Sequence, residues 1–216
     1  STLHPEFSFL PRKFKIAVSG GTNDRAALRV HDIGLQLCRN DGGKIGFEVM
    51  VGGGQGRTPM LAKTIREFLP KVELLPYLES ILRVYNQLGR RDNIYKARIK
   101  ILVHEIGAQK LAELVETEWC QVRGGFIGLP QDEVARIGRY FAQPPFDPAA
   151  TSDTDSDKTR HADSAFDHWL EHNVDAHKQS GYAIATISLK PKGGVPGDIN
   201  AEQMEAVADL AEHFSF

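Results

Sequence analysis

The first part of the chain alternates apolar and polar positions in a way that predicts short β-strands. Residues 13–18, Lys-Phe-Lys-Ile-Ala-Val, predict a strand that breaks at the glycine pair 20–21. Segments 31–39 and 44–51 flank Asn-Asp-Gly-Gly, which is a strong hairpin-turn signal because glycine tolerates positive φ. The chain is therefore expected to begin with a small sheet.

Apolar residues at three- and four-residue spacing predict that helices follow this sheet. The longest of these segments ends at Gly89, which is typical of a helix C-cap. The expected helices cover residues 59–68, 71–88, 94–105 and 108–120.

The segment 143–164 is rich in Pro, Ala, Ser, Thr and Asp and holds almost nothing to bury, so it predicts a linker. Beyond it the pattern predicts a helix at 165–177, a strand at 181–190 and a helix at 200–213. We therefore expect a domain over residues 1–142, a linker and a smaller unit over 165–216. The mixture of strands and helices predicts an α+β fold.

The composition is that of an ordinary globular chain: 216 residues, 41% hydrophobic, 25% charged and a net charge of -2. Its apolar runs are shorter than the roughly 18 residues of a membrane span, which excludes an integral membrane protein. No signal-peptide pattern follows Ser1. Two cysteines build neither a disulfide framework nor a four-cysteine metal site, so we expect a reducing, cytoplasmic environment.

Charge is distributed unevenly along the chain. Residues 1–106 hold 17 basic and 10 acidic side chains, and the remainder holds 9 and 18. A basic half in a near-neutral protein favours a local anion site over a nucleic-acid-binding surface, with random scatter of surface charge as the alternative. The start at Ser1 and the end just after an amphipathic helix lead us to expect a piece of a longer protein.

A glycine-rich loop, Gly52-Gly53-Gly54-Gln55-Gly56-Arg57, is the first candidate for chemistry. A Walker loop would need glycine at Val51, and the dinucleotide pattern would need its third glycine at Arg57, so both motifs fail. The loop either merely turns the chain or brings backbone N–H groups close to an anionic ligand beside Arg57.

The segment His168-Trp169-Leu170-Glu171-His172 matches the His-x-x-Glu-His pattern of inverted zinc peptidases. That pattern also needs a third ligand and a catalytic fold, whereas Trp169, Leu170 and Val174 indicate an amphipathic helix with histidines on its outer face. We therefore expect no metal ligand in this chain and keep a zinc peptidase as a distant alternative.

Two basic clusters remain. In the predicted first strand, Lys13 and Lys15 would point to one face about 7 Å apart, as in an anion site or on a surface strand. A second set of basic residues follows the long predicted helix. The alternative to a functional role for this set is a solvated helical face. Its members are Arg90, Arg91, Lys96, Arg98 and Lys100.

Taken together, these motifs resemble those of the siroheme-dependent sulfite and nitrite reductases. The resemblance covers roughly residues 3–120 through four motifs in order and at matching spacing. They are Leu10-Pro11-Arg12-Lys13-Phe14-Lys15, His31-Asp32-Ile33-Gly34, Val51-Gly52-Gly53-Gly54, and Gly89-Arg90-Arg91-Asp92-Asn93 with Arg98 and Lys100. Residues 165–216 look like the start of the family's second ferredoxin-like half-domain.

The resemblance implies a first cofactor-binding domain with a mixed sheet and helices on one side, followed by a partial ferredoxin-like module. It implies siroheme bridged through a cysteine to a 4Fe-4S cluster. The implied reaction is six-electron reduction of sulfite to sulfide or of nitrite to ammonia, with a ferredoxin or a flavoprotein reductase as electron donor. No nucleic-acid or membrane partner is expected.

Residue roles follow from the same resemblance. Lys13 and Lys15 match the lysines that hold the anionic substrate, and their ammonium groups suit charge compensation and proton supply. Arginine and lysine suit contacts with the carboxylates of siroheme. The cofactor-binding residues implied are Arg12, Gly52, Gly53, Gly54, Arg57, Arg98 and Lys100.

The chain also departs from the family pattern. The cluster needs four cysteines, and this sequence has only Cys38 and Cys120, far apart. We therefore expect this piece to supply one wall of the site, to bind no cofactor on its own and to be inactive alone. The competing interpretation is a non-catalytic relative that serves as an interaction module.

Overall fold

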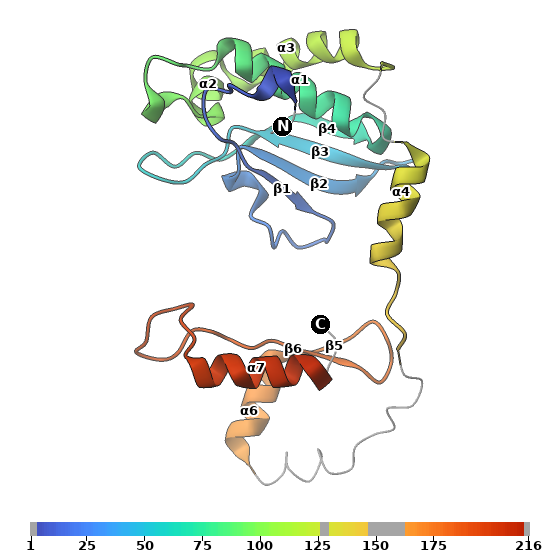
Figure 1. The fold of residues 1–216 in the computed structure, drawn as a ribbon, viewed down its shortest axis with the longest axis vertical. Helices are drawn as coiled ribbons and strands as arrows, with labels where there is room; N and C mark the ends of the chain where they lie inside the picture. The colour runs from blue at the N-terminus through green and yellow to red at the C-terminus, as the bar shows by residue number, and fades with distance from the viewer. Residues whose placement is uncertain (1–3, 126–129, 147–162, 214–216) are drawn as a thin grey trace. The chain divides into compact units, whose positions relative to one another are not determined.

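The computed structural model describes residues 4–125, 130–146 and 163–213. The chain forms two compact units, residues 1–142 and 143–216 (Figure 1). Most of the predicted linker, 147–162, lies outside the described residues. The assignment of the two units to a cofactor-binding domain and a ferredoxin-like half-domain stays a prediction. In the described ranges, no helix has the length and apolar character needed to cross a membrane.

The first unit is built on one four-stranded mixed sheet. Strand β1 pairs in parallel with β2, and the β2–β3 and β3–β4 pairs are antiparallel. The Asn-Asp-Gly-Gly turn joins β2 to β3, and Gly43 has the positive φ (73°) that the turn predicts. The strands are β1 (Ile16–Ser19), β2 (Ile33–Arg39), β3 (Ile45–Val51) and β4 (Lys63–Pro70).

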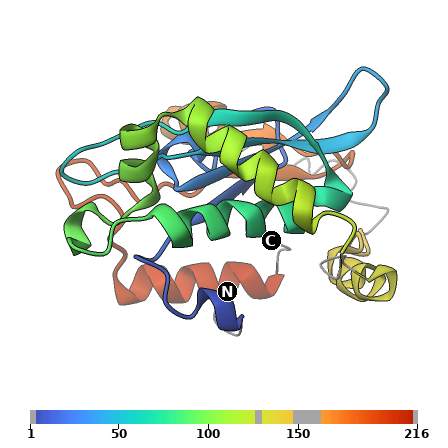
Figure 2. The same cartoon turned by 90° about the horizontal axis from the view of Figure 1, so that it is seen from above.

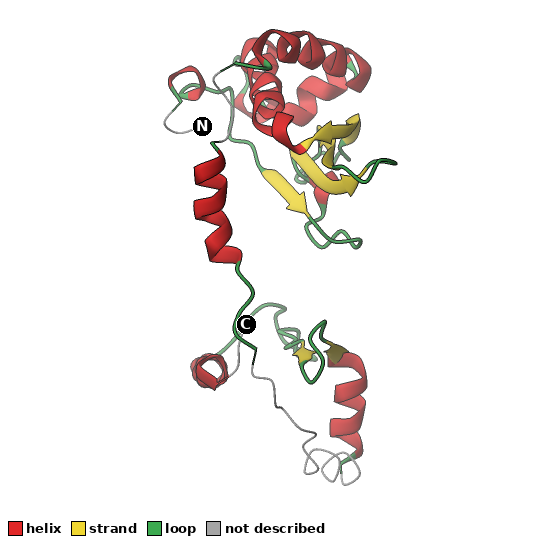
Figure 3. Ribbon diagram, turned by 90° about the vertical axis from the view of Figure 1, so that its right-hand side faces the viewer, coloured by secondary structure: helices red, strands yellow, loops and turns green. Residues whose placement is uncertain are grey.

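Helices cover one face of this sheet (Figure 3). Figure 2 shows α1 and α3 lying side by side across it. The α-helices of the unit are α1 (Leu74–Leu88), α2 (Ile99–Ile106), α3 (Ala108–Val122) and α4 (Gln131–Gly138). Short 3-10 turns are η1 (Pro5–Phe7), η2 (Leu28–Val30), η3 (Lys71–Glu73), η4 (Ile94–Lys96) and η5 (Arg139–Phe141). The predicted α+β class, with a mixed sheet and helices on one side, is confirmed.

The main hydrophobic core lies between the sheet and the helices. Alternate strand residues such as Ile33 and Leu35 point into it and meet Tyr77 and Ile81 of α1. The opposite face of the sheet carries a smaller cluster beneath η2, formed by Ala17, Leu28, Met50 and Ala62.

The helix predicted over residues 59–68 is wrong, because the chain from Lys63 onward forms strand β4 and the residues before it form no helix. Irregularities in the pairing with β3 occur between Phe47 and Val49 and again between Val49 and Met50. Such bulges change which side chains face the core. The alternation of apolar and polar residues that identifies a strand is therefore interrupted in the sequences of β3 and β4. The remaining apolar spacing imitates a helix.

Other boundaries also differ from the expectation. The strand predicted at 181–190 forms only over Ala183–Ala185, and the helix predicted at 94–105 begins at Ile99. Strand β1 begins at Ile16, so Lys13 and Lys15 precede it and the same-face argument for the two lysines does not hold. The predicted helix at 165–177 ends at Asn173, where the chain enters a short strand.

The second unit is small and open. Asp163 caps α6 by accepting hydrogen bonds from the backbone N–H groups of Ala165 and Phe166. Strands β5 and β6 form an antiparallel pair. Its elements are α6 (Ser164–Asn173), β5 (Val174–Ala176), β6 (Ala183–Ala185) and α7 (Ala201–His213). Among the residues of this unit that the structure describes, none is buried.

The first prediction concerns the core beneath α1. Replacing Leu82, which is 7% exposed, with Ala should lower the free energy of unfolding of the first unit by about 3 kcal/mol, because a cavity replaces packed methyl groups. Leu88→Ala on the same helix, 46% exposed, is the matched control and should cost less than about 1 kcal/mol. Urea denaturation of the 216-residue chain measures both. Equal losses would contradict this account of the core.

The second prediction concerns Gly53, where the chain passes close to other backbone. A Cβ at this position would overlap the carbonyl oxygens of Arg29 and His31. Gly53→Ala should therefore destabilise the unit by about 2 kcal/mol, because those carbonyls are backbone atoms that cannot turn away. Gly20→Ala is the control, since its new Cβ would meet only the Leu37 side chain at 3.9 Å. A thermal melt in which the two variants behave alike would refute the steric explanation.

Candidate functional site

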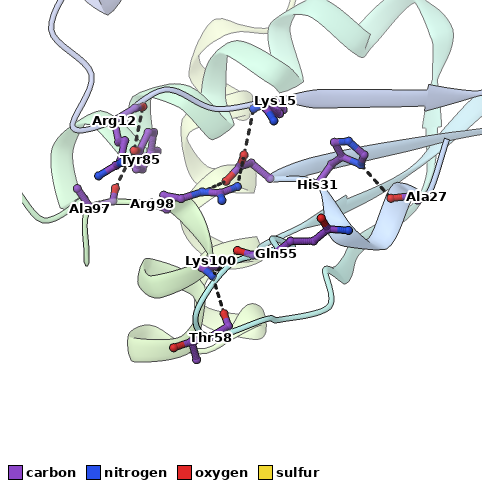
Figure 4. Close-up of polar contacts among 11 residues, drawn as sticks. Arg12, Lys15, Ala27, His31, Gln55, Thr58, Tyr85, Ala97, Arg98 and Lys100 are labelled. Atoms are coloured by element: carbon purple, nitrogen blue, oxygen red, sulfur yellow. Dashed lines mark hydrogen bonds and ion pairs between the residues drawn. The ribbon is translucent and has the colours of Figure 1, made fainter. Parts of the chain in front are cut away.

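The centre of the candidate site is a buried carboxylate at the start of β2. The Asp32 side chain is only 1% exposed. It accepts a hydrogen bond from the backbone N–H of Lys15 (3.1 Å) and two from the Arg98 guanidinium (3.2 and 2.8 Å), as Figure 4 shows around the labelled Lys15 and Arg98. The Asp32 carbonyl also accepts from the Gly52 N–H at 3.0 Å. Asp32 therefore links three segments to one another: the chain before β1, the glycine-rich loop and the start of α2.

The partner, Arg98, is the residue immediately before α2. A carboxylate as buried as Asp32 needs a charged, hydrogen-bonded partner, and a two-point contact from a guanidinium provides one. The Arg98 side chain remains 27% exposed, so the pair lies at the edge of the core.

The glycine-rich loop lies close against α2. Gly52 has φ of 96°, a conformation that favours glycine, and a Cβ there would meet the Val103 side chain at 2.8 Å. A Cβ at Gly54 would lie 3.0 Å from the Lys100 side chain and 3.1 Å from that of Arg98. The glycines therefore allow the loop backbone to approach the cationic start of α2.

Lys100 holds this loop in place. Its ammonium group donates hydrogen bonds to the carbonyls of Gln55 (3.1 Å) and Thr58 (2.5 Å) (Figure 4). Burial, and next the nearby charge of Arg98, lower the pKa of Lys100, while Asp32 acts in the opposite direction. The lysine thus works as a bridge between helix and loop.

Arg12 and Tyr85 secure the segment that leads into β1. The Arg12 guanidinium donates to the Ile94 carbonyl, and the Tyr85 hydroxyl lies 2.8 Å from the Ala97 carbonyl and 3.1 Å from the Arg12 carbonyl. Burial raises the pKa of Tyr85 to about 12, so its hydroxyl keeps its proton at neutral pH and remains a donor.

Arg12, Arg98, Lys100 and part of the loop line a cavity of about 650 Å³, and basic side chains predominate among its charged lining residues. Five basic side chains and one acidic side chain border it, together with polar and apolar groups. The lining residues are Arg12, Gln55, Arg57, Thr58, Met60, Tyr95, Lys96, Arg98, Lys100, Ile101, His104 and Glu105. An adjoining cavity of about 590 Å³ shares Met60, Lys100 and His104 and has a largely apolar lining that includes Leu61 and Val103.

The cations of the cavity fall into two groups. Arg12, Arg98 and Lys100 are engaged with groups of the chain itself, as described above. The side chains of Arg57 and Lys96 make no hydrogen bond or ion pair within the described part of the chain. They are therefore available to an anionic ligand. Such a ligand would meet positive charge at one side and apolar surface at the other.

Lys13 and Lys15 do not line this cavity. Both side chains are exposed, and their ammonium groups have no hydrogen-bond or ion-pair partner among the described residues. The backbone of Lys15 is nevertheless fixed by Asp32, which also fixes Arg98. The same buried carboxylate thus links the backbone of Lys15 to Arg98 of the cationic wall.

The structure brings Arg12, Arg57, Arg98 and Lys100 together as expected neighbours, but their individual roles stay predictions. Asp32 belongs to one of the sequence motifs but has no predicted function. Tyr95 and His104 line the cavity and are not among the predicted site residues. A lone acidic residue directly before a buried strand was the signal for Asp32. No comparable signal marks Tyr95 or His104.

The histidines of the predicted peptidase pattern lie in the other unit, on helix α6. His168, Glu171 and His172 are all exposed. They share no residue with the cavity of the first unit.

Comparisons with known proteins agree with the motifs. The model of the family described as "Nitrite and sulphite reductase 4Fe-4S domain" matches residues 1–122. The ferredoxin sulfite reductase of Synechococcus elongatus is 38% identical over 116 residues, which is 50% of this chain and 19% of the relative. The NADPH sulfite reductase hemoprotein beta-component of Staphylococcus haemolyticus is 34% identical, over 50% of this chain and 20% of the relative.

Among solved structures, the Mycobacterium tuberculosis NirA protein matches with a TM-score of 0.50 and 30% identity, covering 58% of this chain and 22% of that protein. The chain spans about a fifth of the length of the curated relatives it matches. The family match covers more than half of the chain and contains every residue of the cationic cavity. The chain therefore belongs to the siroheme-dependent nitrite and sulfite reductase family.

Proposed function

We propose that this chain is part of a cytoplasmic reductase that converts sulfite to sulfide, or nitrite to ammonia, by six-electron transfer. The observation that carries the proposal is the cavity bordered by five cations and joined to an apolar neighbour, within the family-matched residues. The names of the relatives specify ferredoxin or NADPH, which supports a ferredoxin or a flavoprotein reductase as the electron donor.

The residues present fit siroheme, an apolar macrocycle with carboxylate groups at its edge. Arg57 and Lys96 would meet carboxylates directly, because their side chains are otherwise unengaged. Arg12, Arg98 and Lys100 add positive charge around them while holding the walls in place. Gly52 lines the adjoining apolar cavity, and Gly53 and Gly54 let the loop pack closely against the Arg29 and His31 backbone and the Arg98 side chain.

Siroheme and its 4Fe-4S cluster, when bound, supply the electron transfer and the iron that takes the substrate. Lys13 and Lys15 would bind the anionic substrate through charge, since their ammonium groups are exposed and unpartnered in the described structure. Their protons can be donated to the oxygen atoms that leave as water. Each oxygen leaves with two protons, so donors beside the substrate lower the barrier to its departure.

The cluster ligands must come from outside this sequence. A 4Fe-4S cluster takes four cysteine thiolates, and the chain has only Cys38 in β2 and Cys120 in α3. The chain thus supplies contacts to substrate and siroheme but not to the cluster. We expect it to be inactive when isolated from the rest of the site.

Asp32 provides the third prediction. Asp32→Asn should destabilise the first unit by about 3 kcal/mol, because Arg98 loses the charge that compensates it at the edge of the core. Asp41→Asn, at an exposed turn position, is the matched control and should change the free energy of unfolding by less than about 0.5 kcal/mol. Chemical denaturation of the 216-residue chain separates the two. A small effect at Asp32 would show that the carboxylate is not the contact that organises the site.

The fourth prediction tests the substrate role in the intact protein that contains this chain. Lys13→Met and Lys15→Met should each lower turnover of sulfite or nitrite about 100-fold, because a positive charge and a proton donor are lost. The haem absorbance should remain, since neither lysine borders the cavity. Lys44→Met, at an exposed hairpin position, is the control and should keep full activity. Unchanged turnover in both test variants would refute the proposed function.

A further inference from the structure

Helix α6 of the second unit places three potential metal ligands on one face. His168, Glu171 and His172 stand at positions i, i+3 and i+4, which are neighbours on a helix surface. One nitrogen of each imidazole and one carboxylate oxygen lie within 4.8 Å of one another. The two imidazole rings have their centroids 4.3 Å apart.

The hydrogen bonding of His172 leaves a ligand atom available. Its Nδ1 lies 2.8 Å from the backbone carbonyl oxygen of His168, which can only accept, so Nδ1 carries the proton. The lone pair is then on Nε2. A ring N–H held by a backbone carbonyl is also the arrangement that orients histidine ligands in metal sites.

The charge of Glu171 is also open to a cation. Within the described part of the chain its one ion-pair contact is His168, with Nδ1 and Oε2 4.0 Å apart, and no Lys or Arg reaches it. A comparable cluster in the first unit, His4, Glu6 and Glu79, differs in this respect. There the guanidinium of Arg83 already forms ion pairs with both carboxylates, at 3.0 Å from Glu6 and 2.8 Å from Glu79.

The α6 cluster has room to close around an ion. Zinc bonds to nitrogen and oxygen measure about 2.0–2.2 Å, which puts neighbouring ligand atoms of a tetrahedral site about 3.3 Å apart. The His168 and Glu171 side chains are 75% and 72% exposed, so they can rotate together without disturbing a core. Water would take the fourth position.

We propose that His168, Glu171 and His172 form a binding site for a divalent transition-metal ion such as Zn²⁺ on helix α6. Two imidazoles and one carboxylate are ligands that suit zinc, nickel and copper. The proposal replaces the sequence-based expectation that this chain holds no metal ligand. It concerns binding alone and does not revive the peptidase alternative. Bound metal would brace a helix in a unit whose described residues include none that is buried. The site shares no residue with the siroheme proposal, so either can fail without the other.

The fifth prediction is tested by calorimetric titration of ZnCl₂ into the untagged 216-residue chain. We expect saturable binding of one ion, weakened at least tenfold by His168→Ala or His172→Ala and several-fold by Glu171→Gln. His177→Ala, outside the cluster, is the matched control and should bind as the original chain does. Circular dichroism of each variant checks that the helices are retained.

Three outcomes would overturn the proposal. They are the absence of saturable zinc binding in the original chain, binding that survives in the His168→Ala/His172→Ala double variant, and loss of binding in His4→Ala with no effect of His172→Ala. The last result would place the ion at the cluster of the first unit.

Discussion

The ion pair between Asp32 and Arg98 is the contact on which the candidate site depends. It joins two positions that are 66 residues apart in the sequence, and the same carboxylate holds the backbone of Lys15. The Asp32 carbonyl in turn receives the N–H of Gly52. Because a buried carboxylate without a partner is strongly unfavourable, these segments are constrained to come together. Lys100 then completes the wall by fastening the glycine-rich loop to α2.

The strand and helix pattern could be predicted where pairing is regular. The β2–β3 hairpin and the helix ending at Leu88 follow from turn residues and from three- and four-residue spacing. Strand β4 could not be predicted, because the irregular pairing with β3 breaks the period that identifies a strand. The start of β1 was misplaced for another reason: Phe14 continues the apolar alternation although the residue lies outside the strand.

The site could be predicted only in part. The basic motifs identify which cations gather at the cavity, but not which of them are free. The ammonium group of Lys100 donates hydrogen bonds to the carbonyls of Gln55 and Thr58, and the Arg98 guanidinium pairs with Asp32. Such long-range partners leave no periodic signal in a sequence. As a result, of the two unengaged cations at the cavity, Arg57 was among the predicted cofactor-binding residues and Lys96 was not.

We propose that this cationic cavity is one wall of a siroheme site. The most direct measurement is the ultraviolet–visible spectrum of the intact protein that contains the chain, compared with that of an Arg57→Gln/Lys96→Gln variant. We expect a siroheme absorbance band in the intact protein and a clear loss of siroheme per chain in the variant, with the fold retained. An intact protein without that band, or a variant with undiminished siroheme content, would contradict it.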